Sequence, residues 1–407
     1  MVCNAGAVAL KTRLSNYPVG SAFVRRVPTL KSEPKRLSSP KSSFGQQSLK
    51  KNDALQILRA VAALLVVYAH SIDLVEGRRL PKQMNFFHLA RFGACGVDIF
   101  FAISGFILST VILRTKVGTP RMALDFLTRR YIRILPIYWI LSLFYLIYGA
   151  KHHSLTTGLV LNSYLLLPSL HYPMQAPLIF VGWTLVFEMF FYYFLSFNLL
   201  FGKAAAIPRA IISILLMVGL GTIVGFQKPI LILIANPINV EFALGCCIAL
   251  LYAKFGVRPA LGAALLVIGG FTLGMTVFLG YGNVDGAQFT LNGQASWYRV
   301  LVWGVPAAVL TAGFVFRPGE IRSHFGKFWV YLGDASYSIY LTSSITLFFF
   351  NRGYRFVTGI PQDLNVFLAL ILVALVGATI YSWIERPITH YITKRYQQTK
   401  MVPQQVA

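Results

Sequence analysis

The chain has 407 residues, of which 56% are hydrophobic and 12% are charged. Soluble domains carry about a quarter charged residues, so this composition argues against a soluble enzyme. Lysine and arginine outnumber aspartate and glutamate by 37 to 13. The basic residues lie mostly in short segments between apolar blocks, so the charge indicates membrane topology and no nucleic-acid partner. The four cysteines lack metal-ligand spacing, so we expect neither a metal site nor a disulfide framework.

The N-terminal segment 1–52 is rich in Lys, Arg, Ser and Pro. It lacks the apolar core of about 7–15 residues that a secretory signal peptide needs. We expect a basic, disordered cytoplasmic tail over 1–52 and a second, short cytoplasmic tail over 397–407. The predicted membrane domain covers 53–396.

Apolar blocks of the length that a helix needs to cross a bilayer, about 20 residues, follow along the chain. The blocks cover 54–72, 90–113, 134–150, 178–201, 208–226, 229–252, 259–280, 296–316, 331–350 and 364–384. This pattern predicts an all-α polytopic membrane protein, a bundle of about ten transmembrane helices. We expect Pro237 to break the helix of the sixth block. The stretch 155–170 is too short and polar for a span and indicates a re-entrant or interfacial segment.

The basic residues of the loops predict the orientation of the bundle. With the N-terminus inside, the inner segments carry more Lys and Arg than the outer ones, and 114–133 contributes six of them. The first outer loop runs against the pattern with Arg78, Arg79, Lys82 and Arg91. The balance predicts that both termini lie in the cytoplasm.

Arg59 and His70 lie in the first span, eleven residues apart. Eleven residues are close to three helical turns, so both side chains share one helix face at an axial distance of about 16 Å. The pair suits a ligand that is anionic at one end and reactive at the other. The alternative is an arginine that reaches the interface and an unrelated, hydrogen-bonded histidine.

Two further arginines, Arg130 and Arg133, are three residues apart at the cytoplasmic end of the third span. Paired guanidinium groups suit phosphate oxygens. A positive-inside anchor explains them equally well.

Among the carboxylates within spans, Glu188 in the fourth and Asp98 in the second stand out. A buried carboxylate needs a cation or a proton. Three roles compete: structural partner of an arginine, orienter of His70, or proton acceptor. Structural pairing is favoured for Asp98.

Together these segments resemble the acyltransferase 3 family of integral-membrane acyltransferases from Asp53 to Tyr396. The tail before residue 53 lies outside the resemblance. The motifs that carry it are Arg59-x10-His70, GVDIFFAISGF (96–106), Arg130-x-x-Arg133 with RILPIYW (133–139), WTLVFE (183–188), SYSIYL (336–341) and ERP (385–387).

The resemblance implies a membrane O-acyltransferase of the bacterial inner membrane. Such enzymes move an acyl group, most often acetyl, from cytoplasmic acyl-CoA to hydroxyls of glycans such as exopolysaccharide or O-antigen. Acetyl-CoA is then a co-substrate, with no bound cofactor. The expected partners are acyl-CoA, a glycan acceptor, the lipid bilayer and a complex for polysaccharide synthesis or export.

The resemblance also assigns roles to residues. His70 corresponds to the catalytic histidine, and Arg59, Arg130 and Arg133 serve the coenzyme. Histidine suits the removal of a proton from an acceptor hydroxyl, and an acylated His70 that relays the group is the competing mechanism. Glu188 is expected to orient His70 or to hold the sugar. Many members carry a histidine after the SYSIYL run, where this chain has Thr342 and Ser343.

Two other classes of protein fit some of these features. An exporter of glycans or lipid intermediates also has many spans with polar residues inside them, but it needs no Arg–His line and no phosphate-binding pair. An inactive scaffold of a polysaccharide synthesis complex is the third reading. The retained His70 and the arginines argue against it.

Overall fold

The computed structural model of the chain describes residues 52–76, 92–115, 119–151, 155–279, 287–294, 296–354 and 361–401. The predicted tail 1–52, apart from Asn52, lies outside these residues, as do 402–407 and the basic residues of the first outer loop. The predictions for both tails therefore stay predictions.

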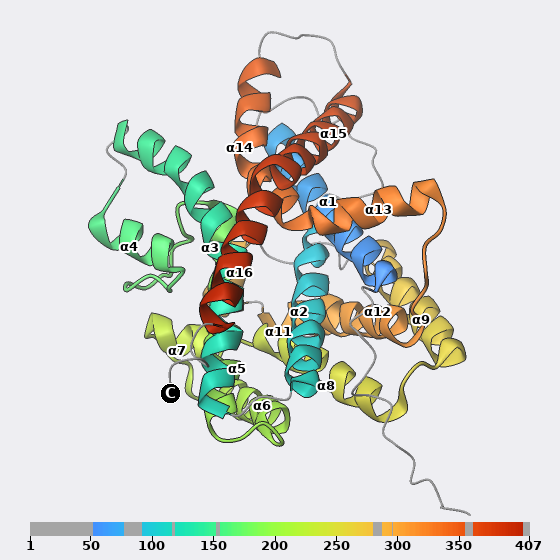
Figure 1. Cartoon of the computed structure of the whole chain (residues 1–407). Helices are drawn as coiled ribbons and strands as arrows, with labels where there is room; N and C mark the ends of the chain where they lie inside the picture. The colour runs from blue at the N-terminus through green and yellow to red at the C-terminus, as the bar shows by residue number, and fades with distance from the viewer. Residues whose placement is uncertain are drawn as a thin grey trace, which may run out of the picture. The chain divides into compact units, whose positions relative to one another are not determined.

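All regular elements of the described residues are helical (Figure 1). Short 3₁₀ or π turns join or extend several α-helices. In chain order the elements are α1 (Asp53–Glu76), η2 (Phe92–Ala94), α2 (Cys95–Arg114), α3 (Thr119–Lys151), α4 (Thr157–Leu165), η3 (Phe180–Gly182), α5 (Trp183–Leu200), α6 (Ala206–Val224), α7 (Pro229–Ile234), α8 (Asn239–Phe255), α9 (Pro259–Phe278), α10 (Ala287–Leu291), α11 (Ser296–Arg299), η4 (Val300–Gly304), α12 (Val305–Phe316), α13 (His324–Asp334), α14 (Ser336–Tyr354), α15 (Gln362–Ile380), η5 (Tyr381–Glu385) and α16 (Arg386–Met401).

Within the described part of the chain, 9 helical segments are long and apolar enough to cross a membrane. They correspond to nine of the predicted blocks, which confirms an all-α polytopic membrane protein. The segments are Asp53–Asp73, Phe92–Arg114, Pro120–Lys151, Phe180–Leu200, Ala206–Val224, Pro229–Phe255, Pro259–Phe278, Trp297–Phe316 and Gln362–Thr399.

The predicted block 331–350 is not a single helix. Its first residues end α13, the chain bends at Ala335, and α14 begins at Ser336. Hydroxyl side chains make α14 polar, and those of Thr342 and Ser343 donate hydrogen bonds to carbonyl groups of the preceding turn. This segment therefore falls outside the apolar spans.

The predicted break at Pro237 is confirmed, as is the shortness of the stretch 155–170, whose re-entrant or interfacial position stays a prediction. The sixth block breaks before Asn239 into α7 and α8, with Pro237 in the break, because proline removes a backbone donor and clashes with the preceding turn. The stretch 155–170 contains only the nine-residue helix α4, about 14 Å long and too short to cross a bilayer.

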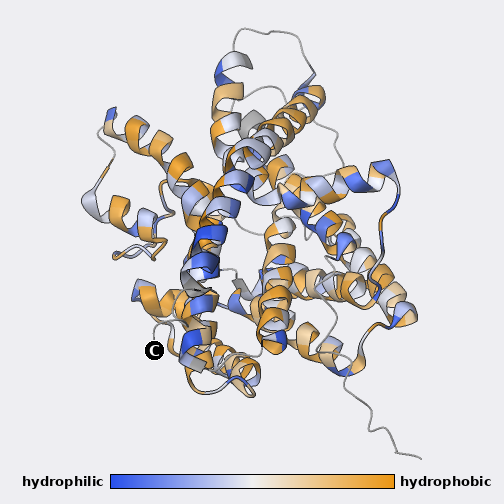
Figure 2. Cartoon of the chain, in the orientation of Figure 1, coloured by the Kyte–Doolittle hydropathy of each residue, from blue (hydrophilic) through white to orange (hydrophobic). Residues whose placement is uncertain are grey.

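The helices that surround the site pack against one another directly. α1 packs along α2, α13, α14 and α15, whereas α3 contacts α5 and α16. α2 lies along α8. The polar helix α16 stands out in blue in Figure 2, next to the apolar α15 that it continues.

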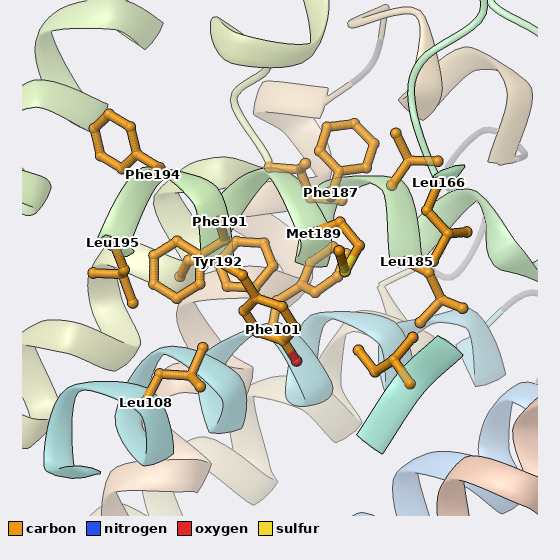
Figure 3. Packing of buried hydrophobic residues seen from close by; sticks show 14 of the residues in the cluster. Phe101, Leu108, Leu166, Leu185, Phe187, Met189, Phe191, Tyr192, Phe194 and Leu195 are labelled. Atoms are coloured by element: carbon orange, nitrogen blue, oxygen red, sulfur yellow. The ribbon is translucent and has the colours of Figure 1, made fainter. Parts of the chain in front are cut away.

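Aromatic side chains of α5 form much of the core between α2 and α8. Figure 3 shows Phe187, Phe191 and their neighbours on α5 facing Phe101 of α2. Phe242 of α8 stacks between the other rings, with centroid distances of 4.5 Å to Phe101 and 4.4 Å to Phe191. This packing holds α5, and with it Glu188, against α2.

The predicted structural pairing of Asp98 with an arginine is confirmed, and the partner is Arg299. Arg299 donates from Nε to Asp98 Oδ1 at 2.9 Å and from Nη2 to Asp98 Oδ2 at 2.7 Å. Both side chains are buried. The pair ties α2 to α11 across 201 residues of sequence.

Candidate active site

Five helices, α1, α2, α3, α5 and α14, enclose a cavity of about 90 Å³, which we call the bundle cavity. Its wall is mainly apolar. The charged residues that line it are Arg59, Arg130, Arg133 and Glu188. The structure therefore brings four of the five predicted site residues together around one space.

Arg59 enters the bundle cavity from the second turn of α1. Its Nη2 donates to the hydroxyl of Ser336, the first residue of α14, at 3.0 Å. Glu188 and Glu385 lie close enough to attract its charge, and Arg133 lies close enough to repel it. Arg59 is therefore held in place without a direct carboxylate partner among the described residues.

Arg130 and Arg133 project from one face of α3, as their spacing predicts. The guanidinium of Arg130 lies over the rings of Phe126 at 5.7 Å and Tyr192 at 6.0 Å from their centroids. Its Nε is buried, and no acceptor within the described residues reaches it. Aromatic faces stabilise the charge but leave its donors available for a ligand.

Glu188 faces the bundle cavity from the second turn of α5. Its Oε1 accepts hydrogen bonds from Ser104 Oγ at 3.1 Å and from the hydroxyl of Tyr192, one turn further along α5. No described arginine forms an ion pair with it. These two donors stabilise the carboxylate and fix its direction.

A second, more polar cavity of about 370 Å³ lies against α16, and we call it the α16 cavity. Arg59 and Arg133 line it as well, so both arginines stand between the two cavities. Its other polar residues include Arg386, Thr389 and His390. The α16 cavity is thus polar, the bundle cavity is mainly apolar, and the two arginines lie between them.

The α16 cavity also contains carboxylates. Glu385, at the end of the π turn η5, accepts a hydrogen bond from Ser338 Oγ at 2.5 Å. Arg59 and Arg133 lie close enough to stabilise its charge. Glu385 therefore helps to hold these arginines at the boundary of the two cavities.

His70 lines neither cavity. It lies about 16 Å beyond Arg59 along α1, given a rise of about 1.5 Å per residue. Its ring contacts Phe180 edge-on at 6.3 Å between centroids, and its Nδ1 lies 3.9 Å from Asp73 Oδ2. The side chain is 28% exposed. Of the two carboxylates, Asp73 and not Glu188 lies within ion-pair distance of His70.

Several residues of the bundle cavity were not among the predicted site residues. Tyr192 follows Glu188 by four residues, and that helical spacing was the available signal. The resemblance motifs also contain Ser104, Ser336 and Tyr340, which line the cavity. The sequence gave no sign that Ser104 contacts Glu188 or that Ser336 contacts Arg59.

Residues 52–384, which are most of the chain, match the profile of the acyltransferase 3 family, an acyltransferase domain. The chain belongs to the acyltransferase 3 family. It is thus a multi-pass membrane acyltransferase, and the resemblance predicted from the motifs is confirmed.

Two relatives of the chain are informative. Exopolysaccharide production protein ExoZ of Rhizobium meliloti is 31% identical over 312 residues, which are 74% of this chain and 91% of ExoZ. O-acetyltransferase OatA of Staphylococcus aureus is 26% identical over 329 residues, which are 73% of this chain but 52% of OatA. The chain therefore spans about half the length of OatA. No solved structure matches the chain.

Proposed function

We propose that this protein transfers an acetyl group from acetyl-CoA to a hydroxyl of a glycan that is membrane-associated or lies outside the cytoplasm. The observation that carries the proposal is the gathering of Arg59, Arg130 and Arg133 around one cavity. The names of the relatives support the chemistry, since OatA is an O-acetyltransferase and ExoZ a protein of exopolysaccharide production.

The donor enters from the α16 cavity in this proposal. Its phosphates bind Arg59 and Arg133, with Arg386 of the α16 cavity as a further cation, and Arg130 contacts the donor from the bundle cavity. The pantetheine arm passes between the two arginines toward the bundle cavity. That cavity, at about 90 Å³, has room for only part of the donor, so the nucleotide stays in the α16 cavity.

The reaction needs a base and an acyl donor. The acceptor hydroxyl loses its proton to the base, its oxygen forms a C–O bond with the acyl carbon, and the C–S bond of the thioester breaks. The proton then returns to the sulfur of the coenzyme. Histidine is suited to both proton transfers near neutral pH.

His70 is the proposed base or acyl relay. In the first mechanism its imidazole takes the proton from the hydroxyl, and in the second it accepts the acyl group and passes it on. Asp73 is in range to orient the ring. The axial distance of about 16 Å between Arg59 and His70 is of the order of a pantetheine arm. Because His70 does not line the bundle cavity, a donor held at Arg59 presents its thioester near His70 by extending beyond that cavity along α1.

Glu188 has a different role in the proposed reaction. Its carboxylate, fixed by Ser104 and Tyr192, stands among the arginines. We propose that it limits the surplus positive charge of the bundle cavity and directs the arginines toward the donor. A role in holding the sugar remains the alternative that was predicted from the sequence.

The proposal includes a location and partners. Both termini and the α16 cavity face the cytoplasm, where acetyl-CoA is made, and the membrane is the bacterial inner membrane. The acceptor then reaches His70 from the other side. A complex for polysaccharide synthesis or export supplies that acceptor.

The test uses the full chain in membranes or nanodiscs with acetyl-CoA labelled in the acetyl group and a panel of glycan acceptors. The wild type and the control His324→Ala, which changes an exposed histidine at the start of α13, transfer the label. His70→Ala loses transfer by about 10²–10⁴-fold, the usual contribution of a general base.

Two results would contradict the proposal. Equal transfer by the wild type and His70→Ala removes His70 from the mechanism. Passage of an unmodified glycan across sealed vesicles, without acetyl transfer to any acceptor, supports an exporter instead.

A further inference from the structure

A second group of charged residues is buried where α2, α8 and η4 meet. Asp98 is 0% exposed and Arg299 is 2% exposed, and two hydrogen bonds join them. Arg299 Nη2 also donates to the backbone carbonyl of Ala94 at 2.9 Å. This pair alone is neutral.

Glu241 adds a third ionisable group to the pair. It lies in the first turn of α8, is 0% exposed, and neither of its carboxylate oxygens accepts a hydrogen bond from the described residues. Its carboxyl group lies within hydrogen-bond reach of the carboxyl group of Asp98. Gly304 packs directly against the Glu241 carboxyl group, since a Cβ at Gly304 would stand 2.6 Å from Glu241 Oε1.

The charges of this group do not balance. Two carboxylates and one guanidinium leave a net charge of −1 in a buried space. Among the described residues, Cys95 and Tyr340 are further titratable groups that interact with the cluster, and neither brings a positive charge. The guanidinium of Arg299 also lies over the rings of Trp183 and Trp303, which are neutral. An uncompensated buried charge is strongly unfavourable, so a cation must be present.

A proton is the cation that fits. Two carboxyl groups in contact cannot both be ionised, and a shared proton gives Glu241 the hydrogen bond that it otherwise lacks. Metal cations with oxygen ligands take about six of them. The two carboxyl groups offer four oxygens, of which two already accept hydrogen bonds from Arg299.

We propose that Asp98, Glu241 and Arg299 form an intramembrane proton-binding site, in which one proton joins the two carboxyl groups. The neutral cluster then fastens α2 to α8 and to the end of α11, where the π turn η4 begins. It also fixes Arg299 beneath Trp183, the residue that starts α5 and precedes Thr184 in the wall of the bundle cavity. The proposal is independent of the acyl donor and acceptor.

Infrared spectroscopy of the purified full chain in nanodiscs tests the site directly. The carboxylic acid band of Glu241, which is separate from the bands of ionised carboxylates and shifts in D2O, is present in the wild type and missing in Glu241→Gln. The control Glu320→Gln, at an exposed residue, changes only carboxylate bands. A difference between wild type and Glu241→Gln that consists only of carboxylate bands would overturn the proposal.

A charge-balance series provides a second readout that does not need the infrared assignment. Glu241→Gln is isosteric with the protonated side chain, so its folded yield stays within about twofold of the wild type. Combining it with Asp98→Asn leaves Arg299 without a carboxylate, and we expect a loss of about tenfold or more, beyond the product of the single losses. Adding Arg299→Gln restores part of the yield.

A comparison of salts distinguishes a bound proton from a bound metal cation. Wild-type heat stability is measured in sodium chloride, potassium chloride and choline chloride at equal ionic strength. The proposal predicts equal stability in all three salts. A selective gain in sodium that Glu241→Gln abolishes would show a bound metal cation and overturn the proton site.

Discussion

The bundle cavity and the Asp98–Glu241–Arg299 cluster carry opposite surpluses of charge within one set of helices. Three arginines and one glutamate surround the bundle cavity, so positive charge is in surplus beside open space. The cluster has two carboxyl groups and one arginine, so negative charge is in surplus where the side chains are fully buried. A surplus beside a cavity suits an exchangeable anionic ligand, whereas a surplus in a packed interior requires a permanent counter-charge.

The largest expected effect on stability comes from a substitution that breaks the buried cluster. Arg299→Met removes the guanidinium but leaves both carboxyl groups, so the protein loses about 3–5 kcal/mol of stability. Heat stability in detergent, followed by size-exclusion chromatography, measures the loss.

The matched control for that loss is Arg322→Met, at a side chain that is 90% exposed. It changes stability by less than about 0.5 kcal/mol. If the two variants unfold at the same temperature, the buried pair does not hold the helices together.

The next effect is on the bundle cavity. Glu188→Gln removes the carboxylate that Ser104 and Tyr192 orient, and we expect turnover to fall by about 10–100-fold, as for the loss of a charged hydrogen-bond partner. Affinity for acetyl-CoA stays equal or increases, because the positive surplus grows. Initial rates and equilibrium binding of acetyl-CoA measure the two effects.

Glu320→Gln is the control, since its side chain is exposed. Normal turnover in Glu188→Gln together with weaker acetyl-CoA binding would reverse the role that we assign to Glu188.

A smaller effect on stability is expected from a substitution at Gly304, which packs against Glu241. Gly304→Ala places a methyl group 2.6 Å from Glu241 Oε1, and the overpacking costs about 1–3 kcal/mol of stability. Gly219→Ala, at a helical glycine with open space around it, is neutral or slightly stabilising because alanine favours helices. Thermal unfolding compares the two. Equal stability of both variants would show that the cluster has room to relax.

The contrast between the two regions also shows what the sequence could predict. The spans follow from local apolar runs, and the shared face of Arg130 and Arg133 follows from helical spacing. The partners of charged residues do not, because they come from distant segments: Arg299 is 201 residues from Asp98, and Ser336 is 277 residues from Arg59. The sequence showed Glu241 as an acidic residue in the interrupted sixth block, but it gave no indication that Asp98 is its neighbour.

The position of His70 shows a similar limit. Its face on α1 relative to Arg59 follows from helical geometry. Which helices cover that face depends on tertiary packing. The sequence therefore offered Glu188 as one candidate to orient His70, whereas the carboxylate within ion-pair distance of it in the structure is Asp73. The break between α13 and α14 was missed because the apolar residues on both sides were assigned to one block, although Asp334 and Ser336 lie between them.

The most direct measurement of the proposed donor site is equilibrium binding of acetyl-CoA to the full chain in nanodiscs as a function of salt. If the arginines of α3 contact the donor, Arg130→Ala combined with Arg133→Ala weakens binding by about tenfold or more and lowers its salt dependence. Arg129→Ala, on the same helix but exposed and paired with Asp125, binds like the wild type. Unchanged binding in the double variant would make these arginines topological anchors and contradict the proposed donor site.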